Sequence, residues 1–317
     1  MRLSAHFSGY QSSTAAQGIA NILIAVALFA VMDAIVKWLS VYYPIAQLVF
    51  FRSFLAFVPL SILIFRDGGW RSLRTSRPGG HMLRSLIGLA SMTLFFWAFA
   101  VLPLADAVAI SFSGPLFLTL LSIPLLGERV GPRRWLAVLA GFAGVLLIVR
   151  PGSGLFGLTA LIPVGAALGF ALAMICVRRL SITESNTAIV FYFTLTCTLV
   201  SGMALPFEWV TPAPAHWLPL IAIGLIGGTA QLFMTQAFRL APASTVAPFE
   251  YTAIVFALLF GVLIWNEIPD AWMLVGTAVV IASGLYILHR ELLRKGAPTH
   301  ATAAARAAVA GTQPADD

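Results

Sequence analysis

Two matching stretches decide the fold of this chain: LPLADAVAISFSGPLFLTLLSIPLLGERV at residues 102–130 and LAPASTVAPFEYTAIVFALLFGVLIWNEIPD at residues 240–270. With an offset of 139 residues they align without a gap, and identities fall at Pro103/Pro242, Phe117/Phe256 and Glu128/Glu267. Each stretch contains an apolar run close to the ~20 residues that a helix needs to cross a bilayer. The pair therefore predicts a repeated unit that includes a membrane-spanning helix.

The composition extends this interpretation to the whole chain. Of the 317 residues, 60% are hydrophobic and only 10% are charged, which is too few polar groups to cover a water-soluble core of this length. No ten-residue alternation suggests a β-barrel. We expect an all-α polytopic membrane protein with ten transmembrane helices, at 18–39, 44–65, 82–102, 105–126, 133–150, 158–178, 187–206, 217–238, 243–264 and 270–288.

The repeat divides these helices into two groups of five. Near the start of each half an offset of 141 residues gives further identities, at Phe29/Phe170, Leu39/Leu180 and Phe50/Phe191. Because five is odd, the second half enters the membrane from the other side, which is typical of secondary transporters. We expect two inverted repeats, at 18–150 and 158–290, between an N-terminal segment (1–17) and a disordered cytoplasmic tail (291–317).

The excess of seven positive charges indicates membrane orientation. If the spans alternate, the opposite side has only Lys37 and Arg150. The other cations of the connections share one side: Arg66, Arg71, Arg74, Arg77, Arg84, Arg129, Arg133, Arg134, Arg178, Arg179, Arg239, Arg290, Arg294 and Lys295. This distribution predicts a multi-pass protein of a bacterial-type inner membrane with both termini in the cytoplasm, and it argues against a nucleic-acid partner.

The two quoted stretches and the ten-helix plan resemble the EamA branch of the drug/metabolite transporter superfamily. The resemblance covers roughly residues 18–290. MDAIVKWL (32–39), VFFRSFLAF (49–57), and EYT followed by NEIPD resemble a subgroup that includes riboflavin and S-adenosylmethionine uptake transporters. This resemblance implies a secondary active transporter that takes up a vitamin- or nucleoside-like metabolite by alternating access. An amino-acid or drug exporter of the same family is the alternative.

Most charges lie at the ends of the predicted spans, but four lie wholly or partly inside them: Asp33, Lys37, Arg52 and Glu250. A lone charge at the bilayer centre costs about 2.5–3.5 kcal/mol on insertion scales, so such groups usually face a cavity or one another. Asp33, Arg52 and Glu250 have no charged counterpart in the other repeat, which favours a role in substrate binding or gating. The alternative is a structural ion-pair network, since the four formal charges sum to zero.

Two aromatic residues, Trp97 and Tyr251, are predicted to lie at the same cavity. Lys37 follows Asp33 by one helical turn, so we expect Asp33 to stay ionised beside it. Glu250 has no cation within four residues and is the candidate for proton coupling. Three other carboxylates are given structural roles: Asp106 as a helix cap, and Glu128 and Glu267 at span ends.

An enzyme is disfavoured because the sequence has no catalytic constellation. The five histidines lie in tails or at span ends, and no HExxH, GxSxG or phosphate-binding glycine loop occurs. This leaves a membrane-bound acyl-transfer enzyme without a candidate mechanism. A channel would need a ring of like charges or a filter loop. We predict no cofactor and no metal, with a small-molecule substrate and the lipid bilayer as partners, and leave open a homodimer.

Overall fold

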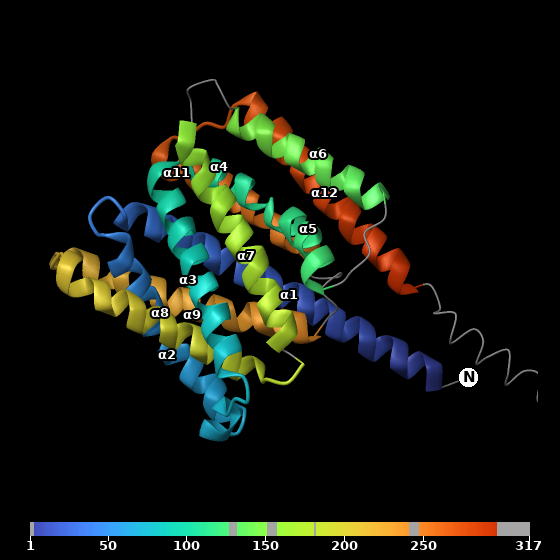
Figure 1. Cartoon of the computed structure of the whole chain (residues 1–317), viewed down its shortest axis with the longest axis horizontal. Helices are drawn as coiled ribbons and strands as arrows, with labels where there is room; N and C mark the ends of the chain where they lie inside the picture. The colour runs from blue at the N-terminus through green and yellow to red at the C-terminus, as the bar shows by residue number, and fades with distance from the viewer. Residues whose placement is uncertain (1–2, 127–131, 151–156, 181, 241–246, 297–317) are drawn as a thin grey trace, which may run out of the picture.

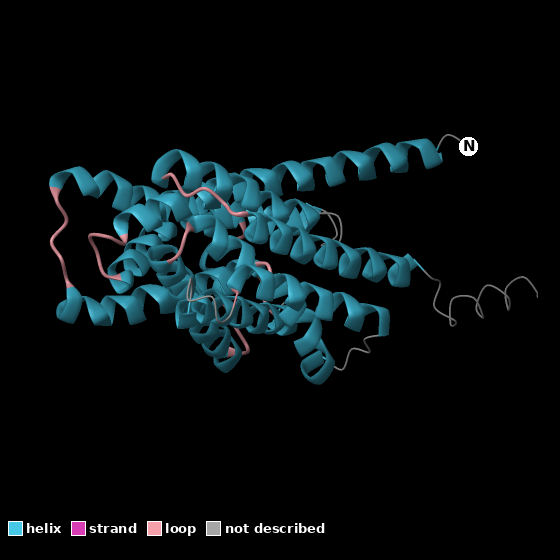
Figure 2. Ribbon diagram, turned by 90° about the horizontal axis from the view of Figure 1, so that it is seen from above, coloured by secondary structure: helices cyan, strands magenta, loops and turns pink. Residues whose placement is uncertain are grey.

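The computed structural model describes residues 3–126, 132–150, 157–180, 182–240 and 247–296. These ranges are mostly helical, with short turns and loops between the helices (Figures 1 and 2). The first half contains α1 (Leu3–Leu39), α2 (Ile45–Arg66), α3 (Pro78–Val101), α4 (Leu104–Ser111), α5 (Gly114–Leu126) and α6 (Pro132–Val149). The second contains α7 (Leu161–Leu180), α8 (Asn186–Glu208), α9 (Trp217–Leu240), α11 (Ala253–Trp265) and α12 (Ala271–Gly296). Four short 3-10 helices lie between them: η1 (Gly69–Leu73), η2 (Gly157–Ala160), η3 (Pro214–His216) and η4 (Ala247–Thr252).

These helices occupy the ten predicted spans. Six are long and apolar enough to cross a membrane, and four shorter apolar helices supply the fourth, fifth, ninth and tenth spans. The ends differ from expectation in two places. Helix α1 begins at Leu3, so the predicted N-terminal segment is largely a continuation of the first span, and α12 extends to Gly296, past the predicted start of the tail at 291. Residues 297–317 and Glu128 lie outside the described ranges.

Proline explains the interruption of two spans. Proline lacks an N–H group and its ring clashes with the carbonyl four residues earlier, so it breaks a helix. The fourth span divides between α4 and α5, just before Pro115. In the described part of the ninth span the 3-10 helix η4, which contains Pro248, comes first, and the chain is α-helical from Ala253. Proline does not interrupt every helix: Pro59 lies inside the unbroken α2, and Pro163 lies in the first turn of α7.

The helices pack as two inverted repeats. Helix α1 packs against α9, and its repeat counterpart α7 packs against α3. Helix α2 also packs against α9, and its counterpart α8 packs against α3. Three other contacts pair a helix with its own counterpart: α2 with α8, α4 with α11, and α6 with α12. The last pair lies side by side in Figure 1. The N-terminal end of α1 and the C-terminal end of α12 point the same way in both views, as an even number of spans requires (Figures 1 and 2).

Glycine permits the closest of these contacts. A Cβ atom on Gly144 of α6 would lie 2.8 Å from the carbonyl oxygen of Gly276 on α12. A Cβ atom on Gly224 of α9 would lie 2.7 Å from the carbonyl oxygen of Phe51 on α2. Only a residue without a side chain fits at either crossing, so Gly144 and Gly224 allow these helices to pack closely.

Candidate substrate site

Arg52 is the central residue of the candidate site. It lies near the middle of α2 with only 6% of its surface exposed, and its Nε atom has no hydrogen-bond partner. Gly227 of α9 provides the space, because a Cβ atom there would lie 3.5 Å from Nε of Arg52 and 2.5 Å from the sulfur of Met32. A buried guanidinium with an unused donor is costly in a bilayer. Its position between the halves favours contact with a ligand.

A small cavity of about 10 Å³ lies beside Arg52, which is close to the space that one water molecule needs. It is bounded by helices of both repeats, α2 on one side and α8 and α9 on the other. The lining residues are Arg52, Ala56, Leu60, Val190, Phe193, Thr194, Gly228, Gln231 and Leu232. A space of this size holds no metabolite, so this conformation is closed around the centre.

Asp33 and Arg52 are close enough for their charges to interact, although no ion pair joins them in the described part of the chain. Lys37, one turn beyond Asp33 on α1, does not pair with Asp33. Its Nζ atom instead lies 2.6 Å from Oε1 of Glu267 and donates to the carbonyl oxygen of Leu102 at 2.8 Å. The predicted Asp33–Lys37 interaction is therefore replaced by a contact between the repeats, since span ends far apart in sequence meet here.

Glu267 also stabilises the start of α4. Its second carboxylate oxygen, Oε2, accepts a hydrogen bond of 2.9 Å from the backbone N–H of Leu104. Asp106 lies in the first turn of α4, where its carboxylate favours the helix dipole, but the cap position itself is taken by Pro103. The carboxylate that accepts from the backbone at the helix start comes from the other repeat, and the structural role predicted for Glu267 agrees with its contacts.

Further contacts join the two repeats at the same end of the molecule. Arg150 of the first repeat bonds Asp270 of the second. The hydroxyl of Tyr43 lies 2.7 Å from Nδ1 of His216 and accepts from the N–H of Ala213 at 3.1 Å. Together with Lys37 and Glu267, these residues form what we call the outer contacts, because the charge distribution predicts that this end faces away from the cytoplasm.

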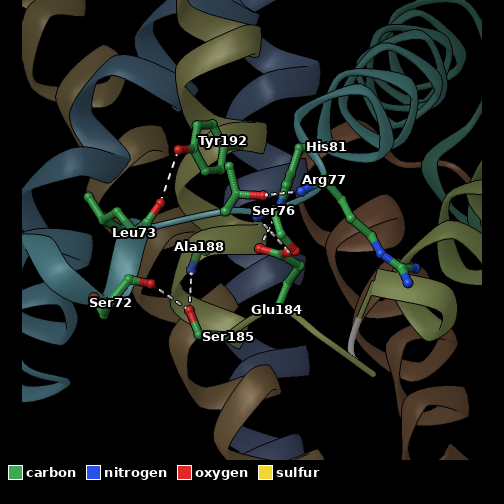
Figure 3. Close-up of polar contacts among 10 residues, drawn as sticks. Ser72, Leu73, Ser76, Arg77, His81, Glu184, Ser185, Ala188 and Tyr192 are labelled. Atoms are coloured by element: carbon green, nitrogen blue, oxygen red, sulfur yellow. Dashed lines mark hydrogen bonds and ion pairs between the residues drawn. The ribbon is translucent and has the colours of Figure 1, made fainter.

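The opposite end is also closed by polar contacts between the repeats (Figure 3). Glu184, in the connection before α8, accepts hydrogen bonds from the N–H and hydroxyl groups of Ser76 at 3.1 and 2.9 Å. Nε2 of His81 on α3 lies 3.3 Å from the Glu184 carboxylate, and both side chains are almost fully buried. Burial raises the pKa of Glu184, but hydrogen bonds from Thr75, His81 and Ser76 outweigh it and lower the pKa to about 2.

Arg84 is a site residue that the sequence analysis missed. We grouped it with the arginines of the connection after α2, but it lies within α3, and its guanidinium carbon is 3.9 Å from the ring centre of Phe193. Its Nε and Nη1 atoms have no hydrogen-bond partner. Two features of the sequence pointed to it. Arg84 lies one turn before Gly88, which aligns with Gly227 at an offset of 139 residues, and Arg84 itself aligns with the uncharged Ile223.

Glu250 and Tyr251 lie together in η4, which packs against α1 and α11. In the described part of the chain Glu250 makes no ion pair, so the proposed four-residue network is not formed. Tyr251 packs its ring 4.9 Å from that of Phe112, at the break between α4 and α5. Its hydroxyl fills the space that a side chain on Gly284 of α12 would need.

Trp97 lies on a different face of α3 from Arg84. Half of its surface is exposed (49%), and it continues the exposed stripe formed by Leu83, Leu86 and Val101 at helical spacing. In a membrane such a stripe faces lipid. Trp97 is not among the residues that line the central cavity.

Comparison with known proteins agrees with this architecture. The profile described as the EamA-like transporter family matches residues 16–150 and again 157–289. A solved structure, titled only as the crystal structure of a protein, superposes with a TM-score of 0.61 at 21% identity, covering 90% of this chain and 98% of its own. At that identity the likeness shows the fold alone.

Three curated relatives cover most of the chain. The pseudopaline exporter CntI of Pseudomonas aeruginosa is 35% identical, over 84% of this chain and 94% of its own. The riboflavin transporter of Vibrio cholerae is 31% identical, over 87% and 94%. The S-adenosylmethionine uptake transporter of Rickettsia conorii is 30% identical, over 86% and 93%.

Proposed function

The chain belongs to the EamA-like transporter family, and we propose that it carries a small organic metabolite across the inner membrane by alternating access. The observation that carries this proposal is Arg52, buried with an unused donor beside a cavity bounded by both repeats. Secondary transporters bind substrate near the midplane where their repeats meet. Arg52 is in the middle of its span, at such a junction.

The contacts at both ends support a carrier over a channel. At one end Lys37 and Glu267 join the repeats, and at the other His81 and Glu184 do so. A carrier needs a state in which both ends are closed, and it opens one end by breaking one set of contacts while keeping the other. The small central cavity fits that closed state.

The relatives suggest the substrate class, and their names include both an uptake transporter and an exporter. We propose uptake of a vitamin- or nucleoside-like metabolite, such as riboflavin or S-adenosylmethionine. The pseudopaline exporter favours the second candidate, export of an amino-acid-like or drug-like compound. For Glu250 we propose proton coupling, because it is a carboxylate in a membrane span without an ion pair in the described residues.

We also propose that the protein is not an enzyme. Two of its histidines are held in contacts between the repeats, His81 by Glu184 and His216 by Tyr43. Neither is placed as a base beside a reactive thiol or hydroxyl that faces a cavity.

Counterflow in proteoliposomes tests the function. Vesicles loaded with riboflavin, S-adenosylmethionine or a mixture of amino acids should accumulate the labelled compound that the protein carries, and empty vesicles should not. The protein inserts into the vesicles in both orientations. We therefore impose a proton gradient of each sign and compare which one drives accumulation, because uptake together with protons and export in exchange for protons respond to opposite gradients. Accumulation of no compound beyond the protein-free control would count against the proposal. Reporter fusions should place both termini in the cytoplasm, and an external C-terminus would overturn the inverted topology.

A further inference from the structure

Two arginines share one aromatic ring in the centre of the molecule. The guanidinium carbon of Arg84 lies 3.9 Å from the ring centre of Phe193, and that of Arg52 lies 6.0 Å from it. Their separation therefore cannot exceed about 10 Å, the sum of these distances. The face of an aromatic ring has partial negative charge, so Phe193 attracts both cations.

The repeat shows that this arrangement is asymmetric in charge. Phe193 is the counterpart of Arg52 at an offset of 141, and the repeated glycines Gly88 and Gly227 each make room for one of them. A Cβ atom on Gly88 would lie 2.9 Å from the Phe193 ring and 3.3 Å from Nη1 of Arg84. The two repeats thus build the same packing, but both arginines come from the first.

The cluster has more positive than negative charge. Cys197 is close enough to act on both arginines, but a cysteine thiol is neutral. In the described residues Asp33 is the one carboxylate whose charge acts on Arg52, and the charge of Arg52 opposes that of Arg84. Lys37 is neutralised elsewhere by Glu267. Two guanidinium groups and one carboxylate leave one positive charge in excess. An uncompensated charge away from water is unfavourable, so the cluster favours the arrival of an anion.

Three donor atoms in the cluster are also unused: Nε of Arg52, and Nε and Nη1 of Arg84. A guanidinium presents its donors as a planar fork that matches the oxygens of a carboxylate or phosphate. Arg52 and Phe193 both line the central cavity, and Arg84 contacts the same ring, so an anion that displaces the ring would reach both arginines.

We propose that Arg52 and Arg84 form one anion-binding site, which takes a carboxylate or phosphate group of the carried metabolite, while Phe193 holds both arginines when the site is empty. This rests on the proposed function and specifies the chemistry of the substrate. A neutral compound, or one whose anionic group is blocked as an ester or amide, binds this site poorly. The anion site therefore favours S-adenosylmethionine, which has a carboxylate, over riboflavin, which has neither a carboxylate nor a phosphate.

The test uses the full chain in nanodiscs of neutral lipid and measures its unfolding temperature. The probes are phenyl phosphate and phenylacetate, with phenylacetamide as the neutral match, at constant ionic strength. Both anions should raise the unfolding temperature of the wild type and the amide should not. In Arg84→Gln the concentration that gives half of the maximal shift should rise at least tenfold, and Arg84→Lys should recover part of the loss.

The matched control is Arg74→Gln, which removes an exposed arginine from the nearby connection and should leave the response unchanged. Equal responses in Arg84→Gln and Arg74→Gln, or no anion response in the wild type, would overturn the proposal. A purely structural role for Arg84 would instead lower the unfolding temperature of Arg84→Gln without changing the probe concentration that gives half of the maximal shift. Phe193→Leu provides a second variant, which should keep the anion response because it retains both arginines.

Nanodiscs that contain phosphatidylglycerol distinguish a lipid headgroup from a soluble anion. If lipid phosphate occupies the site, these discs alone will stabilise the wild type and abolish the probe response, which contradicts the proposal. The result of the unfolding-temperature test can be separated from that of the transport assay. Transport of a panel compound with no anion response refutes the anion site only, whereas transport of nothing refutes the carrier function.

Discussion

Removing the charge of Glu267 should open the outer end of the protein. Lys37 and Glu267 are 2.6 Å apart with side-chain exposures of 10% and 22%, so their interaction is neither fully buried nor fully solvated. A hydrogen bond to a charged group contributes about 1.5–3 kcal/mol. We take about 2 kcal/mol for this pair, which corresponds to about a 30-fold change in an equilibrium constant. If the pair forms only when the outer end is closed, its loss shifts the population toward the open form by that factor.

Thiol labelling measures this shift. Ala107 is fully buried on α4, one turn beyond Leu104, so Ala107→Cys in a background without Cys176 and Cys197 reports access from outside. Glu267→Gln keeps an oxygen that accepts from Leu104, so α4 retains its start. A membrane-impermeant reagent should label this variant at least tenfold faster than its parent.

A double-mutant cycle with Lys37→Met isolates the pair. The double variant should be labelled at a rate close to that of either single variant, because each removes the same interaction. Asp270→Asn is the matched control, since Asn can still accept from the N–H of Met273 and the Arg150–Asp270 pair is more exposed. It should change the rate less than threefold. Unchanged labelling in Glu267→Gln, or additive effects in the double variant, would refute the reasoning.

Three further predictions concern the remaining ionisable groups. Arg52→Ala should reach the membrane in near-normal amounts but lose at least 90% of transport, and full transport would exclude Arg52 from the site; Arg52→Lys should be intermediate, because lysine lacks the planar fork. Glu250→Gln should abolish the pH dependence of transport between about 5.5 and 8 while leaving some exchange, and wild-type flux that is insensitive to both pH and an uncoupler would exclude proton coupling. The folded-state pKa of Glu184 lies below its usual value, so its stabilisation is present above about pH 4.5 and is lost as pH falls toward 2. Glu184→Gln should remove that part of the pH profile of unfolding, and an unchanged profile would assign the acid sensitivity to other groups.

The sequence alone determined the fold class, because the bilayer imposes one requirement on every span. An apolar run of about 20 residues must satisfy its own backbone hydrogen bonds, which permits helices and little else. The repeated stretches then determined the number of helices and their inverted order. Proline accounts for part of the local structure: α4 ends just before Pro115, whereas α2 continues unbroken through Pro59.

The partners of charged residues depended on the tertiary structure. The spacing of Asp33 and Lys37 predicted an interaction along one helix, but Lys37 pairs with Glu267, 230 residues away. Arg84 lies at the start of the predicted span 82–102 and was grouped with the arginines of the preceding connection, but the packing of α3 directs it onto Phe193 of the other repeat. Hydropathy is a local property of each segment, whereas the energy of a charge depends on which groups from distant segments surround it. The sequence therefore determined the spans, and only their packing decided which charges are neutralised and which are left to bind a ligand.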